Sequence, residues 1–66
     1  MNVVVNGEPT PLPEGASVGD LLRALGLDSA PCAAELNREL VPRRARDATP
    51  LADGDRVEIV TLVGGG

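Results

Sequence analysis

The stretch that decides the fold is RVEIVTLV, residues 56–63, and three glycines at 64–66 follow it. It is rich in β-branched residues and bounded by a turn signal, which is typical of a β-strand. In a strand, successive side chains point to opposite faces of the sheet. We therefore expect a strand with two different faces that leads into a flexible glycine tail. Without Cβ atoms, that tail and its carboxylate are slim enough to enter a narrow enzyme cleft.

At the other end, residues 1–5 form a short valine-rich run that ends at Asn6-Gly7. Both turn positions tolerate a positive φ, so a two-residue hairpin turn is predicted there. The returning arm, residues 8–12, carries Pro9 and Pro11. Because proline cannot donate to a ladder, this arm is predicted to be an edge strand.

One helix is predicted after Ser17, a favourable N-cap, with Asp20 near the positive end of the helix dipole. Gly26 is placed to end it in a left-handed conformation. An apolar stripe at i, i+3, i+4 and i+7 consists of Val18, Leu21, Leu22 and Leu25. A helix of about nine residues is too short to persist alone, so the stripe is predicted to pack on a sheet.

Two further strands are predicted at residues 32–36 and 39–41, joined by Asn37-Arg38, and a polar irregular segment follows at 43–50. The whole pattern predicts an α+β fold, a mixed sheet of four to five strands packed on one helix in the β-grasp arrangement. The first and last strands are expected to be parallel neighbours at its centre. The predicted division is a β-grasp domain at 1–63 and a flexible C-terminal tail at 64–66.

Composition excludes several classes of function. The 66 residues contain no His, Lys or Tyr and a single Cys, so most groups used in acid, base or nucleophilic catalysis are missing, and the chain is not expected to be an enzyme. The net charge of −4 and the lack of aromatic residues disfavour nucleic-acid binding. The chain has no long apolar span, no signal peptide and only one Cys, which is expected to be buried. We therefore predict a soluble cytoplasmic protein. No metal and no bound cofactor are expected.

Three features of this layout are the most specific: Val41-Pro42-Arg43, the segment 54–60 (GDRVEIV) and Val63 followed by the three glycines. With these features the layout resembles the ThiS family of sulfur carriers in thiamine thiazole biosynthesis, which are ubiquitin-like β-grasp proteins. The resemblance implies that a ThiF-like enzyme uses ATP to adenylate the carboxylate of Gly66. A persulfide sulfur donor then replaces AMP, and the thiocarboxylate gives its sulfur to a ThiG-like thiazole synthase. In this scheme Gly64 and Gly65 are the slender tail.

Two further features are candidates for partner docking. Val60 and Leu62 are expected on the outer face of the sheet, with Leu40 or Leu36 beside them, either as a docking patch or as cover for a second layer of core. Arg43, Arg44 and Arg46 form a basic cluster that is most simply read as solvated loop arginines. Arg43 belongs to the family triplet and is a candidate for an ion pair with a partner.

Three alternatives remain open from the sequence. A molybdopterin-synthase-type small subunit and a ubiquitin-like protein modifier would share the fold and the tail, whereas a non-covalent binding module would not need the terminal glycines. Asp28-Ser29 is similar to the phosphopantetheine site of acyl carrier proteins, but Ala30-Pro31 follows and the chain is rich in predicted strands. Ser29 is therefore predicted to be an ordinary loop residue.

Overall fold

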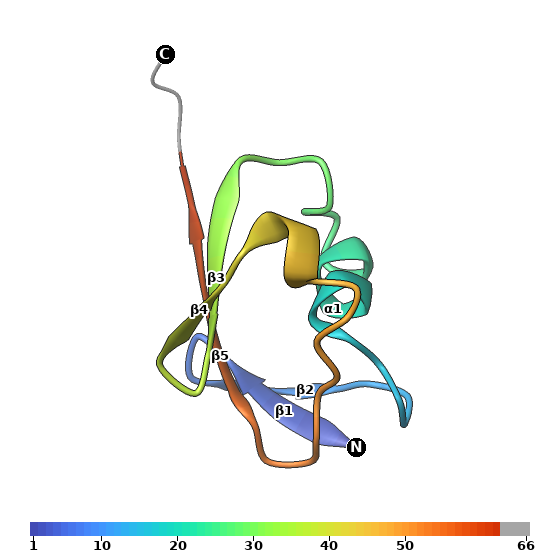
Figure 1. Cartoon of the computed structure of the whole chain (residues 1–66). Coiled ribbons are helices and arrows are strands. Elements are labelled where there is room, and N and C mark those ends of the chain that lie inside the picture. Colours follow the sequence, from blue (N-terminus) through green and yellow to red (C-terminus); the bar gives the residue numbers. More distant parts are fainter. Residues whose placement is uncertain (63–66) are drawn as a thin grey trace.

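The computed structural model of the protein describes residues 1–62 (Figure 1). In chain order its elements are β1 (Asn2–Val5), β2 (Glu8–Pro11), α1 (Val18–Ala24), β3 (Cys32–Leu36), β4 (Glu39–Val41), the 3-10 helix η1 (Arg43–Ala45) and β5 (Arg56–Thr61). The predicted elements are all present. The polar segment that was predicted to be irregular contains η1, and Val63 with the glycine tail lies outside the described residues.

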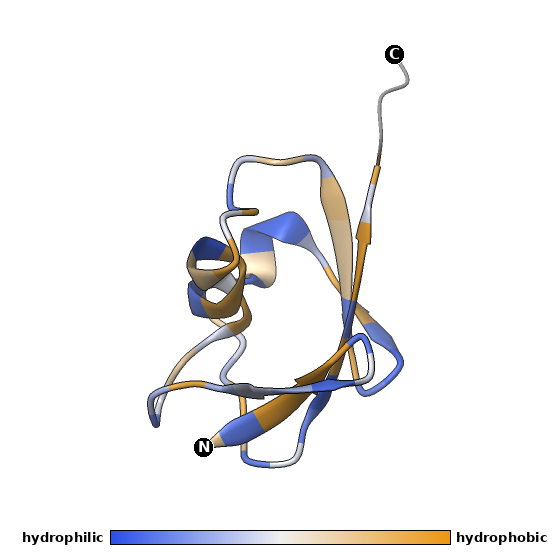
Figure 2. Ribbon diagram, turned by 180° about the vertical axis from the view of Figure 1, so that it is seen from behind, coloured by the Kyte–Doolittle hydropathy of each residue, from blue (hydrophilic) through white to orange (hydrophobic). Residues whose placement is uncertain are grey.

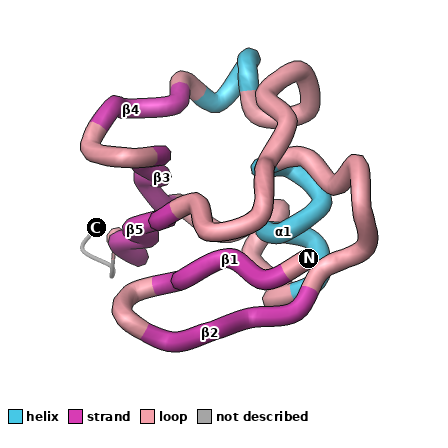
Figure 3. Tube along the Cα trace, turned by 90° about the horizontal axis from the view of Figure 1, so that it is seen from below, coloured by secondary structure: helices cyan, strands magenta, loops and turns pink. Residues whose placement is uncertain are grey.

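The five strands form one mixed sheet in the order β2-β1-β5-β3-β4. β1 and β5 are parallel, and each other neighbouring pair is antiparallel. Viewed from below, the strands follow one another along a curved layer with α1 on its concave side (Figure 3). This confirms the predicted β-grasp arrangement, with the last strand in the middle of the sheet and the proline-bearing strand β2 at one edge.

Both hairpins depend on asparagine at a positive φ. Asn6 and Gly7 have φ of 49° and 86°, and Asn37 and Arg38 have φ of 49° and 73°. Asparagine tolerates this region better than most residues with a side chain. The Asn6 amide also bonds β5, since its Oδ1 accepts from the Ile59 backbone N–H at 2.8 Å and its Nδ2 donates to the Ile59 carbonyl at 3.1 Å. The Asn6 side chain thus continues the β1–β5 pairing where the β1 backbone turns away.

Helix α1 is closed at both ends by its own sequence. Ser17 and Asp20 form a reciprocal capping box, in which the Asp20 N–H donates to Ser17 Oγ and the Ser17 N–H donates to the Asp20 carboxylate. At the other end, the Gly26 and Leu27 N–H groups donate to the carbonyls of Arg23 and Leu22, which is a Schellman motif with Gly26 at a φ of 73°. These caps satisfy backbone groups at both ends of the seven-residue helix.

The predicted apolar stripe holds for three of its four positions. Val18, Leu21 and Leu22 are buried, but Leu25 is 43% exposed. The prediction for Leu25 is wrong because the helix ends at Ala24, which leaves Leu25 as the C-cap residue, outside the periodic face. The core that these residues enter also contains Val3, Val5, Leu12, Ala16, Cys32, Ala34, Val41, Leu51, Val57 and Ile59. Cys32 is buried there, as predicted.

The capping box predicts a pH-dependent contribution to stability. The Ser17 backbone N–H and then the Arg23 guanidinium hold the pKa of the Asp20 carboxyl below its ordinary value. Since the folded-state pKa is lower than the unfolded one, this contribution is present above the unfolded pKa of about 3.9 and is lost as the pH falls through the folded-state pKa. Urea unfolding of the wild type and Asp20→Asn should give free energies that differ near neutral pH and converge in acid. A difference that stays constant with pH would contradict this role.

Within residues 1–62, no helix is long and apolar enough to cross a bilayer, and no group of three or more His, Cys, Asp or Glu side chains is placed to hold a metal ion. All five strands belong to one sheet, and β5, the strand that precedes the glycines in the sequence, lies at its centre.

Candidate functional site

Strand β5 extends past the end of its neighbour β1. The register pairs β1 with β5 only as far as Val57, whereas β3 pairs with β5 as far as Thr61. The Leu62 N–H then donates to the Pro31 carbonyl at 2.8 Å. The last described residues are thus held on the β3 side alone, and this end of β5 points away from the hairpin of β1 and β2 (Figure 1). The predicted reactive residue, Gly66, and its neighbours Gly64 and Gly65 lie outside the described residues.

The two faces of β5 differ as the sequence predicts. Val57 and Ile59 are 1% and 8% exposed and pack in the core, whereas Val60 and Leu62 are 58% and 57% exposed. Figure 2 shows hydrophobic segments on β5 close to the point where the described chain ends. No described element covers this outer face. Among the described residues there is therefore no second core layer over Val60 and Leu62.

Neither of the predicted neighbours, Leu40 and Leu36, lies beside Val60 and Leu62. Val60 lies opposite Ala33 of β3 on the outer face. Leu40 is on the same face and is 66% exposed, but it lies two strands away from β5, in the row of Glu58 rather than that of Val60. Leu36 instead packs against the core, because its register partner is the inward-facing Val57. We define the outer patch as Ala33, Val60 and Leu62.

A pair of carboxylates borders the outer patch. Glu58 of β5 and Glu35 of β3 are directly opposite in the sheet and both are exposed. Like charges at directly opposed positions destabilise a sheet slightly. The repulsion between these two carboxylates lowers the stability of the sheet, and the surrounding water screens part of it. The sequence could not show this pairing, because the two residues are far apart in the chain and meet only through the register of β3 with β5. The outer face therefore combines an apolar patch with a negative border.

Arg43 does not join Val60 and Leu62. It is exposed on η1, which lies on the α1 side of the sheet, and it lines a cavity together with Gly19 and Leu22 of α1. The expectation that Arg46 is a solvated loop residue is wrong: its side chain turns inward, the residue is 7% exposed, and Nη2 donates to the Cys32 carbonyl at 2.6 Å. The predicted site residues thus divide between the two faces of the sheet.

A mixed five-stranded sheet curved around one helix, with its central last strand running out toward terminal glycines, defines a ubiquitin-like β-grasp protein. The model of the ThiS family matches residues 3–66, which is nearly the whole chain and includes the three glycines. The chain belongs to the ThiS family.

Individual proteins agree with this assignment. The sulfur carrier protein ThiS of Thermus thermophilus is 41% identical over 64 residues, which cover 97% of this chain and 98% of that protein. The crystal structure of a thiamine biosynthesis protein (ThiS) from Geobacter metallireducens superposes with a TM-score of 0.83 at 43% identity, and each chain is covered completely. The thiazole synthase of Paramagnetospirillum magneticum is 41% identical over 66 residues. This match covers the whole of this chain but only 20% of that protein.

Proposed function

We propose that this protein is a sulfur carrier of thiamine biosynthesis that acts through the carboxylate of Gly66 and is not itself an enzyme. The observation that supports this most strongly is the match to the ThiS family, which continues through the final glycine. The geometry of β5 fits the role, since this strand runs beyond its neighbour β1 before the tail begins. A carrier needs only a stable body and an unhindered acyl end.

The chemistry of the carboxylate explains why a separate activating enzyme is proposed. A carboxylate with a pKa of about 3.5 is ionised at neutral pH and does not react with a sulfur nucleophile. In the proposed sequence a carboxylate oxygen attacks the α-phosphorus of ATP, and pyrophosphate leaves. The terminal sulfur of a persulfide then attacks the acyl carbon and AMP leaves. A second thiol finally breaks the S–S bond, which releases the thiocarboxylate and forms a disulfide on the donor side. ATP is bound by the activating enzyme and not by this chain.

A thiazole synthase is the proposed acceptor of the sulfur. The support is the segment of one thiazole synthase that is similar to this whole chain over a fifth of its own length. A domain joined to a synthase has a high effective concentration near its active site, which suits a donor that must deliver one atom repeatedly. A free carrier would need a docking surface for the synthase and for the activating enzyme, and the outer patch of Ala33, Val60 and Leu62 is the proposed surface for both.

Intact-mass spectrometry tests this function. After incubation with a ThiF-type activating enzyme, ATP and a persulfide source, the protein should gain the mass difference between sulfur and oxygen, and fragmentation should place the change at Gly66. The Thermus thermophilus carrier serves as a positive control, and a reaction without ATP as the negative one.

The other classes of function predict different products. A protein modifier would appear in isopeptide linkage to lysines of a target. A binding module would show no change in mass and would keep its partner after deletion of Gly65 and Gly66. Conversion of the positive control without conversion of this chain would reject the sulfur-carrier proposal. A thiocarboxylate accepted by a molybdopterin synthase rather than by a thiazole synthase would assign the protein to the neighbouring pathway.

A further inference from the structure

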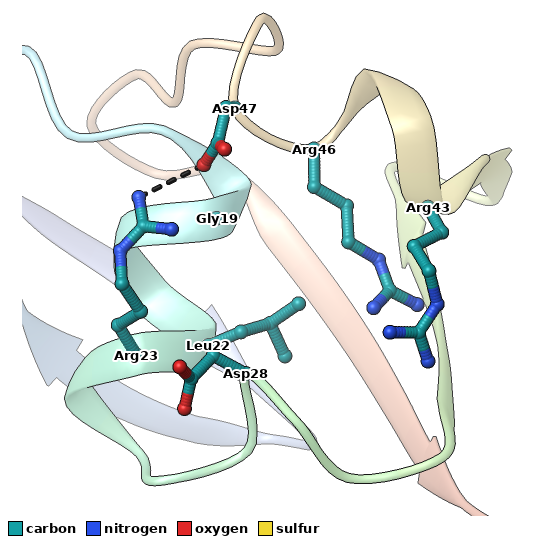
Figure 4. Close-up of a pocket in the computed structure, with 7 residues that line it drawn as sticks. All are labelled: Gly19, Leu22, Arg23, Asp28, Arg43, Arg46 and Asp47. Carbon is teal, nitrogen blue, oxygen red and sulfur yellow. Dashed lines mark hydrogen bonds and ion pairs between the residues drawn. The ribbon is translucent and has the colours of Figure 1, made fainter.

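A cavity of about 170 Å³ lies on the α1 side of the sheet, between α1, η1 and the loop that precedes β3 (Figure 4). The residues that line it are Gly19, Leu22, Arg23, Asp28, Arg43, Arg46 and Asp47. Five of the seven are charged at neutral pH. The function proposed above does not use this cavity.

Arg46 is the least expected residue in this cavity. The residue is 93% buried and its guanidinium carries a permanent positive charge. Nη2 bonds the Cys32 carbonyl, but the buried Nε has no hydrogen-bond partner among the described residues. A buried charge is costly unless it is paired, and a buried N–H without an acceptor adds to that cost. The guanidinium therefore has unused capacity to bind an acceptor.

The carboxylates at the rim do not neutralise this charge. Asp47 is engaged by Arg23, whose Nη2 lies 2.8 Å from Asp47 Oδ1 and 2.9 Å from Asp20 Oδ1. Within residues 1–62, neither Arg46 nor Arg43 has a carboxylate oxygen within salt-bridge distance. Figure 4 shows the Arg43 and Arg46 side chains directed into the same space, with Asp28 on the opposite side. Because Arg23 is shared between Asp20 and Asp47, the positive charge of the cavity is concentrated at Arg43 and Arg46.

The cavity is linked to the end of β5 by a side-chain hydrogen bond and by the pairing of β3 with β5. Arg46 holds the carbonyl of Cys32, and Cys32 is the register partner of Thr61 in β5. The adjacent Pro31 carbonyl accepts from the Leu62 N–H. An anion bound by Arg46 would therefore lie one hydrogen bond from β3, the strand that pairs with the end of β5. Strand β3 thus contacts both Arg46, on the α1 side of the sheet, and β5, which carries the outer patch.

We propose that this cavity is a binding site for a singly charged oxyanion, a carboxylate or a monoanionic phosphate, held between the guanidiniums of Arg43 and Arg46. Arginine is suited to both anions because its planar N–H groups match a pair of oxygens. The two guanidiniums attract an anion, and the negative charge of Asp28 in the same lining disfavours a highly charged one. Arg43 supplies the solvent-facing contact and Arg46 the buried one.

A titration of the isotope-labelled full chain, followed by NMR, tests this site. Sodium phosphate at mildly acidic pH, where it is largely singly charged, and sodium acetate are added separately at constant ionic strength. We expect saturable shifts of the Arg43 and Arg46 Nε–Hε resonances, with the other arginines little changed. Saturation by phosphate alone identifies a phosphate ligand, and saturation by acetate identifies a carboxylate. Saturation by neither anion overturns the proposal.

Two matched variants separate the site from general charge effects. Arg43→Ala removes an exposed arginine that lines the cavity, and it should weaken the apparent affinity about tenfold or more, as expected for charge-assisted hydrogen bonds. Arg44→Ala removes the neighbouring exposed arginine, which does not line the cavity, and should change the affinity by less than about twofold because exposed charges are screened. Equal losses in the two variants would show nonspecific attraction and would reject the site. The titration needs neither ATP nor an activating enzyme, so its failure leaves the sulfur-carrier proposal untouched.

Discussion

Replacing Val60 and Leu62 together by aspartate is expected to abolish binding to the activating enzyme while the fold is retained. Both side chains are more than half exposed, so the free protein loses little core contact. In a complex, each buried aliphatic side chain contributes about 1.5 to 3 kcal/mol. The loss of two corresponds to a weakening of affinity by about 100-fold or more, since about 1.4 kcal/mol is a factor of ten. Isothermal titration calorimetry against a ThiF-type enzyme measures this directly.

Leu40→Asp is the matched control for that variant. Leu40 is 66% exposed on the same face of the sheet, but it lies two strands from β5 and outside the outer patch. It should bind the enzyme within about twofold of the wild type, because a charge outside the contact is screened by salt. Unchanged binding by the double variant would reject the outer patch, and an equal loss in Leu40→Asp would show that the contact extends over the whole outer face. Circular dichroism of all three proteins checks the fold.

The sequence was sufficient to predict the parts of this fold that follow from local rules. The two asparagine turns, the Ser17 cap and the alternation along β5 each depend on a few adjacent residues, and each is present in the structure. The outward direction of Val60 and Leu62 follows from the same period of two. These features need no knowledge of which strands are neighbours.

Features that depend on tertiary neighbours could not be predicted in the same way. Arg46 looks like a loop arginine in the sequence, and only the packing of η1 against α1 and β3 buries it. Glu35 and Glu58 meet because of one register between β3 and β5. A shift of a single residue in that register would have brought Leu36 to the outer face, since neighbouring residues of a strand alternate sides. The strand that carries the proposed docking patch was therefore predictable from the sequence, but the residues that border the patch were not.

The opposite side of the sheet gives the prediction with the largest effect on stability, Leu21→Ala. Leu21 is completely buried, and its stripe on α1 is the main cover of the sheet. A buried Leu→Ala change costs about 2 to 5 kcal/mol, because the transfer energy and the residual cavity add.

A domain of 66 residues has a total stability of only about 3 to 10 kcal/mol. The melting temperature should therefore fall by at least about 10 °C in a thermal scan followed by circular dichroism. Leu25→Ala, at the C-cap of the same helix and 43% exposed, should cost less than about 1 kcal/mol. Equal melting temperatures for the two variants would contradict this prediction, because they would show that the apolar stripe does not hold the helix to the sheet. The caps would then have to stabilise α1 alone. One cap contributes only about 1 kcal/mol, which is too little for so short a helix.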